Sequence, residues 1–190
     1  MRAVISIILL LCLTSTPAIA RENRKWETLN SCVYVANKSN DGDSFHLRCG
    51  TNSFFIRLYF VDTPESKLTY AQRTQEQSVY FGSSLDATLK AGEQATQTVQ
   101  ELLKNPFVVR TRRANAAGRS RESRYYAFVE FDGKDLGQHL VALGLARNKG
   151  LITNLPDGTN WKVYADQLET LENQARQKHL GAWANTAIKK

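Results

Sequence analysis

The stretch from Phe54 to Glu65 reads FFIRLYFVDTPE and brings an arginine, two carboxylates and a proline to the end of an apolar run. The run from Ser53 to Val61 is nearly continuously apolar, which predicts a buried β-strand. Successive side chains of a strand alternate between its two faces. One face should therefore carry Ile56, Leu58 and Phe60, and the other Arg57, Tyr59 and Val61.

Arg57 is a charge inside this apolar strand, and the residues alone allow two interpretations. The strand is an edge strand whose arginine reaches water or pairs with Asp62, or its face opens into a binding site. We favour the site, because a planar guanidinium can bind two phosphate oxygens at once. The turn Asp41-Gly42-Asp43, placed before this strand, adds carboxylates for a candidate cation and phosphate site.

The chain has 190 residues, the size of one domain, and 42% of them are apolar, which is enough for an ordinary core. Residues 1–20 have the pattern of a secretory signal: a positive Arg2, an apolar run and a small-residue site at Ala18-Ile19-Ala20. We expect cleavage after Ala20 and a single domain at 21–190. The apolar run is too short for a stable membrane-spanning helix, so the mature chain is expected to be periplasmic or secreted, free of the membrane.

Two cysteines of the mature chain, Cys32 and Cys49, flank the turn at 39–43 almost symmetrically. If Val33 to Lys38 and Ser44 to Cys49 form a hairpin, the two Cβ atoms approach the distance that a disulfide requires. An exported protein permits this bond, and we expect it as a stabilising link without a catalytic role. The alternative is a pair of reduced, buried small residues.

The net charge is +7 for the whole chain, and Arg2 contributes one of these charges to the signal peptide. A basic surface favours phosphate-rich partners, although surplus lysine is also a common aid to solubility. The position of the charges is more informative than their sum. Six arginines crowd into one short segment, which predicts a basic loop between two strands. They are Arg110, Arg112, Arg113, Arg119, Arg121 and Arg124.

Periodicity predicts an α+β fold with five strands and three or more helices. The expected strands are Ser31–Lys38, Ser44–Cys49, Ser53–Val61, Phe107–Arg112 and Tyr125–Phe131. Helical composition covers Ser66–Asn105, with Gly82 and Gly92 as interruptions, and further helices are expected at Leu136–Ala146 and Trp161–His179. Short strands with a helix between the third and fourth are typical of a five-stranded OB-fold β-barrel.

Several short motifs follow one another along the chain. They are Asp41-Gly42-Asp43-Ser44, Ile56-Arg57-Leu58, Val61-Asp62-Thr63-Pro64-Glu65, Arg124 before an aromatic strand, Asp132-Gly133-Lys134, Gly144-Leu145-Ala146 and Leu180-Gly181-Ala182-Trp183. In this order and spacing they resemble the staphylococcal nuclease (thermonuclease) family. The resemblance covers about Val33 to Ala184, most of the mature chain.

The resemblance implies a Ca²⁺ site formed by Asp43, Asp62 and the backbone carbonyl of Thr63, completed by waters. Carboxylate and carbonyl oxygens are hard ligands that suit this ion. Without the resemblance, a structural role is the more common one for Asp43, because an aspartate in such a turn more often only forms the turn. Asp41 is assigned mostly to the turn itself.

The resemblance also implies that Arg57 and Arg124 bind the phosphate, and that Glu65 takes a proton from the attacking water or orients it. The residues alone leave blander interpretations open. Arg124 is then one more solvated loop charge, and Glu65 a favourable charge at a helix N-terminus. His46, His139 and His179 lack metal-ligand spacing, so the sequence does not support a zinc site.

The sequence departs from the family pattern at several places. Ser44 stands where threonine is usual, and Ser123 and Tyr125 replace the glycines that commonly flank the second arginine. The segment after Ala146 lacks a tyrosine that family members use near the nucleotide. The stretch 67–91 is longer than in short members, and we expect it to form an extra helix that overhangs the cleft and narrows the choice of substrate.

We therefore expect an exported, monomeric, Ca²⁺-dependent nuclease that hydrolyses phosphodiester bonds of DNA and RNA. The alternative is a catalytically silent OB-fold protein that binds nucleic acid through its basic loop, and a weaker one is a partner-binding factor with incidental charge. Binding alone would not require a carboxylate cluster, which repels phosphate unless a metal ion lies there. The expected catalytic residues are Arg57, Glu65 and Arg124, and the expected metal ligands are Asp43, Asp62 and Thr63.

Overall fold

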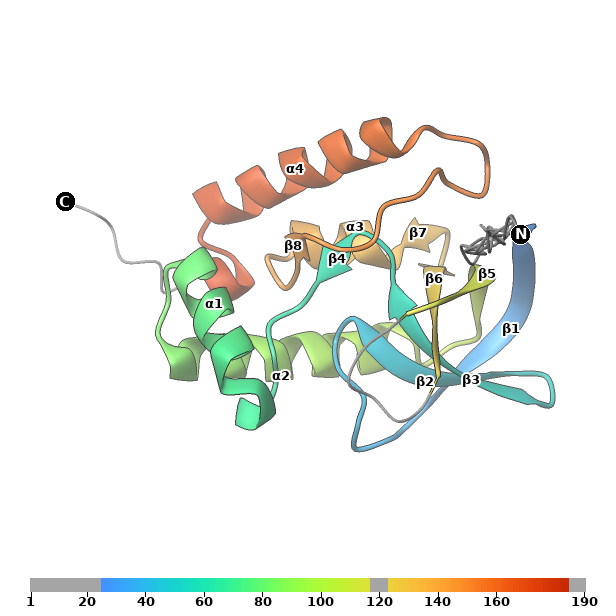
Figure 1. Ribbon diagram of the computed structural model, residues 1–190, viewed down its shortest axis with the longest axis horizontal. Helices are drawn as coiled ribbons and strands as arrows, with labels where there is room; N and C mark the ends of the chain where they lie inside the picture. The colour runs from blue at the N-terminus through green and yellow to red at the C-terminus, as the bar shows by residue number, and fades with distance from the viewer. Residues whose placement is uncertain (1–24, 117–122, 185–190) are drawn as a thin grey trace, which may run out of the picture.

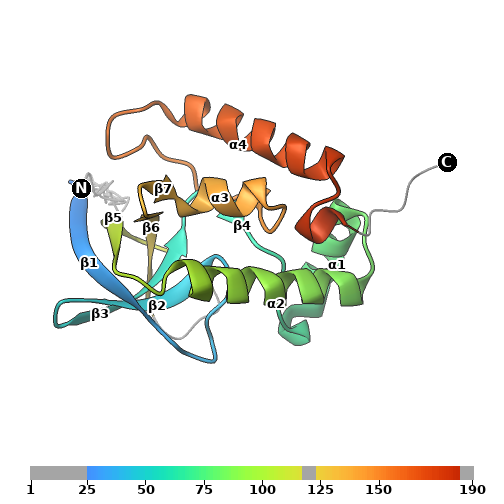
Figure 2. The same ribbon diagram turned by 180° about the vertical axis from the view of Figure 1, so that it is seen from behind.

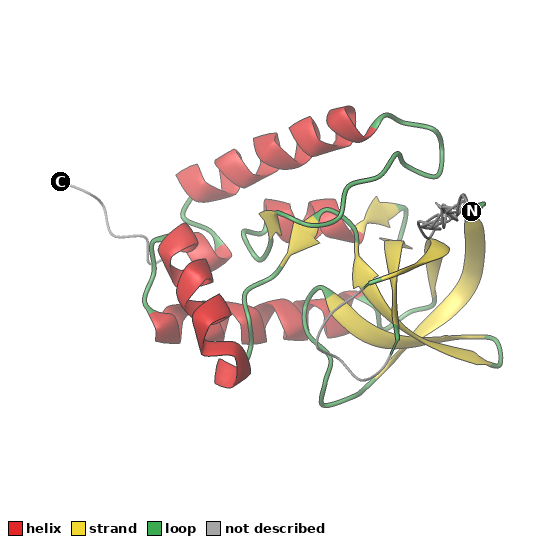
Figure 3. Ribbon diagram, in the orientation of Figure 1, coloured by secondary structure: helices red, strands yellow, loops and turns green. Residues whose placement is uncertain are grey.

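The computed structural model describes residues 25–116 and 123–184. The expected signal peptide at 1–20 lies outside the described residues, as do Arg119 and Arg121 of the basic segment. Strands gather at one end of the molecule and most of the helices at the other (Figure 3). The cleft described below lies where these two parts meet.

Five strands form a closed barrel (Figure 1). They are β1 (Glu27–Val35), β2 (Ser44–Cys49), β3 (Asn52–Leu58), β5 (Phe107–Asn115) and β6 (Arg124–Phe131). Neighbours in the order β3-β2-β1-β5-β6 are antiparallel, and a parallel pairing between β3 and β6 closes the ring. The predicted five-stranded barrel in an α+β fold is confirmed.

Helices pack beside the barrel and beyond one of its ends (Figure 2). They are η1 (Leu68–Tyr70), α1 (Ala71–Phe81), α2 (Leu85–Leu102), α3 (Leu136–Ala142), α4 (Trp161–Gln177) and η2 (Gly181–Trp183). Three further two-residue strands are β4 (Val61–Asp62), which pairs with β8 (Arg147–Asn148), and β7 (Lys134–Asp135), which pairs with β6. The predicted extra helix in the segment 67–91 is present as α1 and the start of α2.

Local sequence explains where these helices begin and end. The side chain of Ser84 accepts a hydrogen bond from the backbone N–H of Ala87 at the start of α2, and Asp135 accepts one from Gln138 at the start of α3. These bonds satisfy N–H groups that a helix start leaves free. Helix α1 ends at Gly82, whose φ of 63° is readily adopted by glycine.

The core fills the barrel and continues under the helices. Phe45, Leu47 and Val109 of the barrel are fully buried, as are Leu136 and Leu140 of α3. A smaller apolar cluster lies between α1, α2, α4 and η2, formed by Phe81, Ala91, Ala175, Ala182 and Trp183. This second cluster fixes α1 against the rest of the molecule, since burying one large apolar side chain stabilises by about 1.5–3 kcal/mol.

The predicted strand Ser53–Val61 was wrong at its end. Strand β3 stops at Leu58, because Phe60 has a φ of 64° and the N–H of Val61 bonds the carbonyl oxygen of Tyr59 at 2.8 Å. Tyr59, Phe60 and Val61 are all buried, so the predicted alternation ends with the strand. The chain turns sharply here and re-forms a short strand at β4.

Other predicted boundaries also need correction. Gly92 does not interrupt a helix but lies in the middle of α2, while the helix predicted to reach Ala146 ends at Ala142 ahead of Gly144, whose φ is 70°. Strand β5 continues to Asn115, so the first arginines of the basic segment lie on a strand. Two of them pair with carboxylates, Arg110 with Glu130 and Arg113 with Glu27.

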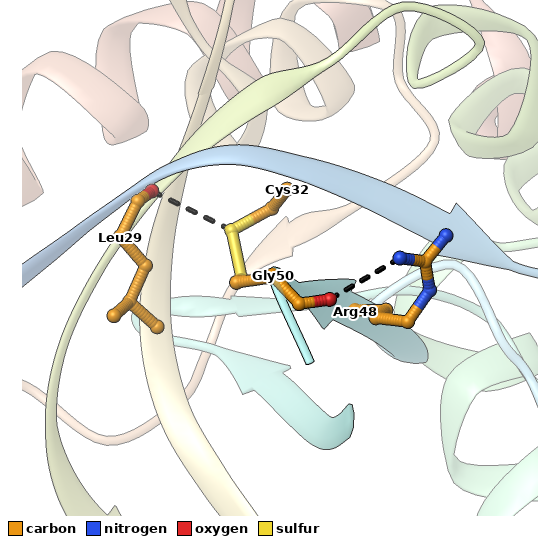
Figure 4. Close-up of a disulfide and its surroundings, with 5 residues drawn as sticks. Leu29, Cys32, Arg48 and Gly50 are labelled. Carbon is orange, nitrogen blue, oxygen red and sulfur yellow. Dashed lines mark hydrogen bonds between the residues drawn. A yellow bond between two sulfur atoms is a disulfide. The ribbon is translucent and has the colours of Figure 1, made fainter. Parts of the chain in front are cut away.

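The predicted hairpin and its disulfide are confirmed (Figure 4), but the first strand, predicted at Ser31–Lys38, runs from Glu27 to Val35. Cys32 of β1 lies opposite Cys49 of β2 in the antiparallel register, with their Cα atoms 4.2 Å apart. The alternative of two reduced cysteines does not hold in this structure. The bond joins the two strands whose turn carries Asp43.

Across 25–116 and 123–184, the helices are all too short or too polar to cross a lipid bilayer.

Candidate active site

Sequence-predicted residues meet at one edge of the barrel because three segments converge there. Arg57 is the penultimate residue of β3, and the turn after β3 returns Asp62 and Thr63 to the same edge. Asp43 directly precedes β2, and its carbonyl oxygen accepts a hydrogen bond of 2.8 Å from the N–H of Leu58. This bond fixes the Asp-Gly-Asp turn against the end of β3.

The two aspartates share one cationic nitrogen. Nη2 of Arg57 lies 2.9 Å from Oδ2 of Asp43 and 3.0 Å from Oδ1 of Asp62. Both carboxylates are almost fully buried, with side chains 3% exposed. Burial opposes ionisation of Asp62, but the guanidinium groups of Arg73, Arg147 and Arg57 outweigh it and lower the pKa of this carboxyl. The two carboxylates thus converge on a point where positive charge is stabilised.

Asp41 lies beside this pair but is in a different electrostatic situation. Burial, followed by the charges of Asp43 and Glu65, raises the pKa of the Asp41 carboxyl to about 8. Its Oδ1 accepts a hydrogen bond of 2.9 Å from the N–H of Gly42. This contact agrees with the role in the turn that the sequence predicts.

Arg124 reaches the same place from β6. Strands β3 and β6 pair in parallel, with Arg124 beside Phe55 and Tyr126 beside Arg57. The outer nitrogens of both arginines approach one atom, the hydroxyl oxygen of Ser44, at 3.4 Å for Arg57 and 3.3 Å for Arg124. The guanidinium of Arg124 also lies over the ring of Phe55. The two arginines therefore converge, despite the missing glycines around Arg124.

Glu65 follows Pro64 in the loop after β4. Its backbone N–H donates a hydrogen bond of 2.8 Å to Oε1 of Gln77, and its carboxylate pairs with Nε of Arg73. Its side chain is 14% exposed and lines the cleft. Arg73 also pairs with Asp62 and so connects Glu65 to the aspartate pair.

The family model described as staphylococcal nuclease homologue matches residues 55–185. The chain belongs to this family. No curated protein matches the sequence. The matched range contains Arg57, Asp62, Thr63, Glu65 and Arg124. Asp43 precedes it, and the fold alone brings that residue to the others.

Membership of the staphylococcal nuclease family indicates a nuclease that binds nucleic acid. It also agrees with the barrel, since the OB-fold is an oligonucleotide-binding architecture.

Several residues at the site were not predicted from the sequence, because they lie outside the short motifs of the family. They are Arg73, Glu76 and Gln77 of helix α1, and Arg147 of β8.

Gln77 is fully buried and holds the loop that carries the predicted residues. Its Nε2 donates to Oδ2 of Asp62 at 3.2 Å and to the carbonyl oxygen of Thr63 at 2.9 Å. Its Oε1 accepts the N–H of Glu65, so one side chain satisfies three positions of this nuclease site. Arg73 and Gln77 are four residues apart on α1 and thus share a face, which the predicted helix already implied.

The side chain of Arg147 is fully buried. Apart from its position directly after Ala146, nothing in the sequence indicates a role for Arg147. Its Nε donates to Oδ2 of Asp62 at 2.9 Å, and its two outer nitrogens donate to Glu76 at 2.8 and 2.6 Å. The pairing of β4 with β8 places Arg147 directly opposite Asp62. The buried guanidinium thus links Asp62 to Glu76 of α1 through charge-assisted bonds.

A cleft of about 1170 Å³ opens in front of these residues, between the barrel edge and α1. Phe55, Tyr70 and Tyr126 contribute aromatic rings to its wall. Its basic side chains are Lys38, Arg57, Lys67, Arg73, Arg124 and Lys149. A cationic groove with aromatic faces suits the phosphates and bases of a nucleic-acid strand.

The oxygen atoms at the site have the chemistry that a hard divalent cation requires. Asp43 and Asp62 already share a cationic nitrogen, and Oγ1 of Thr63 is buried without a hydrogen-bond partner among the described residues. The Thr63 carbonyl accepts a bond from Gln77 and keeps a second lone pair. A set of three or more His, Cys, Asp or Glu side chains that could hold a metal does not occur within the described ranges. The oxygens that the sequence predicts as ligands are thus two carboxylates and one main-chain carbonyl that lie close together.

Proposed function

We propose that this chain is an exported, Ca²⁺-dependent nuclease that hydrolyses phosphodiester bonds of DNA and RNA. The observation that carries the proposal is the convergence of the buried Asp43 and Asp62 carboxylates on one nitrogen of Arg57, whose side chain lines a basic cleft together with Glu65. Carboxylates in a cleft for phosphate would repel the substrate unless positive charge balanced them.

Asp43, Asp62 and the carbonyl of Thr63 would hold the ion, with waters completing its shell. Bound there, Ca²⁺ supplies positive charge to the phosphoryl oxygens and favours ionisation of a nearby water. The lowered pKa of Asp62 supports this role, because it keeps the carboxylate ionised, the form that binds cations.

Arg57 and Arg124 bind the scissile phosphate in this proposal. Their outer nitrogens both approach the Ser44 hydroxyl, so their ends lie close enough to hold oxygens of the same phosphate. Charge-assisted bonds of this kind are stronger than neutral ones and strengthen as charge develops on the phosphate.

Glu65 accepts a proton from the attacking water or orients it. The water oxygen bonds to phosphorus, the bond to the 5′ oxygen breaks, and that oxygen takes up a proton from solvent to leave as a 5′-hydroxyl. The other product keeps a 3′-phosphate, as expected for this family. Glu65 is suited to the task because Gln77 fixes its backbone while its carboxylate faces the cleft.

Export to the periplasm or beyond rests on residues 1–20 and on the bond between Cys32 and Cys49. Disulfides persist in oxidising compartments and are rare in the cytosol, so the bond supports the secretory interpretation of the N-terminus. We further propose that residues 21–190 form one domain that acts as a monomer.

The test is digestion of single- and double-stranded DNA and of RNA by the mature protein across a Ca²⁺ titration. We expect cleavage that rises with Ca²⁺ and stops when a chelator is added. Equal cleavage in chelator would refute the metal assignment. Tight binding of all substrates without cleavage at any Ca²⁺ concentration would instead favour a silent nucleic-acid-binding barrel.

A further inference from the structure

Arg73 of α1 contacts two residues to which the proposed function gives different roles. Its Nη2 pairs with Oδ1 of Asp62, a proposed metal ligand, and its Nε pairs with the carboxylate of Glu65, the proposed base. The guanidinium thus lies between the two acidic groups. In a metal-dependent site, a bound metal ion ordinarily supplies the positive charge at such a position.

The carboxylate of Asp62 has no hydrogen-bonding capacity left. Its Oδ1 contacts Arg57 and Arg73, and its Oδ2 contacts Arg147 and Gln77. An ionised carboxylate offers about four acceptor positions. A cation that binds Asp62 must therefore displace one of these four partners.

Three of the four partners are held in place by other contacts. Arg147 is fully buried and carries two further bonds to Glu76. Gln77 is fully buried with bonds to Thr63 and Glu65. Arg57 extends from the barrel strand, has a side chain only 17% exposed, and also contacts Asp43 and Ser44.

Arg73 is the partner that can leave. Its side chain is 37% exposed, lines the open cleft, and its two ion pairs are with the two acidic groups themselves. Gln77, four residues further along α1, has its own bonds to Asp62 and Thr63, which do not involve Arg73. The helix need not move for the guanidinium to be released.

We propose that Arg73 is an internal counter-ion that competes with Ca²⁺ for Asp62, and that metal binding releases its guanidinium from Asp62 and Glu65 into the cleft. This inference rests on the proposed metal-dependent function. Arg73 then sets the affinity for metal in the absence of substrate, and the released charge faces the phosphates of a bound strand. The extra helix α1 would thereby make metal occupancy and substrate binding depend on each other.

The test is calorimetric titration of Ca²⁺ into the full mature protein without nucleic acid. Removal of the competing charge in Arg73→Gln should tighten Ca²⁺ binding by about 10- to 100-fold, the range expected for loss of a charge-assisted pair. Arg73→Lys keeps a cation and should lie nearer to the wild type. A thermal unfolding curve for each variant establishes that it is folded at the titration temperature.

Lys67→Gln is the matched control, because it removes one positive charge from the same cleft wall. Lys67 is exposed and donates to the carbonyl oxygen of Lys38, so its loss should change Ca²⁺ affinity less than about 3-fold, as expected for a screened charge. An equal increase in Ca²⁺ affinity in Arg73→Gln and Lys67→Gln would mean that any loss of positive charge from the cleft has this effect. That result would overturn the inference.

The outcomes separate this inference from the proposed function. Wild-type protein that binds Ca²⁺ and cleaves nucleic acid, together with unchanged affinity in Arg73→Gln, overturns the competition alone. Absence of Ca²⁺ binding in both wild type and Arg73→Gln overturns the competition and the metal assignment together. Loss of binding in Asp62→Asn, with tighter binding in Arg73→Gln, supports both.

Discussion

Helix α2 touches the backbone of Glu65 at Gly92. A Cβ atom on Gly92 would lie 2.4 Å from the carbonyl oxygen of Glu65 and 2.6 Å from that of Pro64. No real side chain tolerates such a contact with backbone, so the position of the proposed base depends on a glycine in the middle of a helix. A glycine in the middle of a helix lowers the stability of that helix by about 1 kcal/mol relative to alanine.

Gly92→Ala should therefore lower the cleavage rate on the order of 100-fold, because it pushes the Pro64–Glu65 backbone out of place and misplacement by about 1 Å has effects of this size. Steady-state kinetics should show the loss mainly in kcat. Gln97→Ala, at an exposed position of the same helix, is the control and should behave as the wild type. A fully active Gly92→Ala would mean that the loop position is unimportant.

Gln77→Leu should destabilise the protein by about 1–3 kcal/mol. The backbone N–H of Glu65, the Asp62 carboxylate and the Thr63 carbonyl would each lose a hydrogen bond to the Gln77 amide. Urea denaturation measures the change. Gln75→Leu on the exposed side of α1 provides the comparison and should stay within about 0.5 kcal/mol of the wild type. Equal stability of the two variants would contradict the role given to Gln77.

The ion pair between Glu76 and Arg147 should make stability depend on pH. Hydrogen bonds from Arg147 lower the pKa of the Glu76 carboxyl from 4.5 to about 2. A carboxyl with a depressed folded-state pKa stabilises fully above its unfolded value of about 4.5, and this contribution fades as the pH falls toward 2. Because the Glu76 side chain is 47% exposed, screening limits the effect to about 1 kcal/mol.

Urea denaturation of Glu76→Gln at several pH values checks this expectation. The variant should be less stable than the wild type at pH 7, and the difference should shrink steadily below about pH 4.5. Glu93→Gln, at an exposed position of α2, controls for the loss of one negative charge. A constant difference across the range would rule out the linkage.

Replacing Cys32 and Cys49 by alanine should cost about 3 kcal/mol, since the bond closes a loop with a sequence separation of 17. Denaturation of the wild type with and without a reductant should show a similar loss. The cleavage rate of the folded variant should change little, because Cys49 ends β2 while Asp43 precedes the start of that strand. A large loss of rate at unchanged substrate affinity would show that the hairpin positions Asp43 more strictly than proposed.

The sequence predicts the barrel well where local pattern and tertiary packing agree. Strand β2 has the predicted bounds, and the turn between β1 and β2 brings Cys32 opposite Cys49 as expected. The prediction fails where the chain takes an unusual conformation. Phe60 adopts a positive φ that no residue pattern indicates, and this turn is what carries Asp62 back to the barrel edge.

Gly92 and Arg147 show why part of the site stayed hidden. A glycine within a helical pattern normally indicates an interruption, but here close packing against Glu65 requires it. Arg147 and Arg73 follow no short motif, and their roles arise only when β8 and α1 meet Asp62 across separations of 85 and 11 residues. Contacts of this kind depend on the whole fold, which one sequence does not display.

The roles of Glu65 and Arg57 are tested by the single-turnover rate at which wild type, Glu65→Gln and Arg57→Ala cleave a labelled oligonucleotide at saturating Ca²⁺. Arg48→Ala, an exposed position of β2 whose side chain donates to the Gly50 carbonyl, is the control. We expect each site variant to slow cleavage at least about 10- to 100-fold, as for the loss of a charge-assisted contact in the transition state, while the control keeps the wild-type rate. Unchanged rates in Glu65→Gln and Arg57→Ala would contradict these roles.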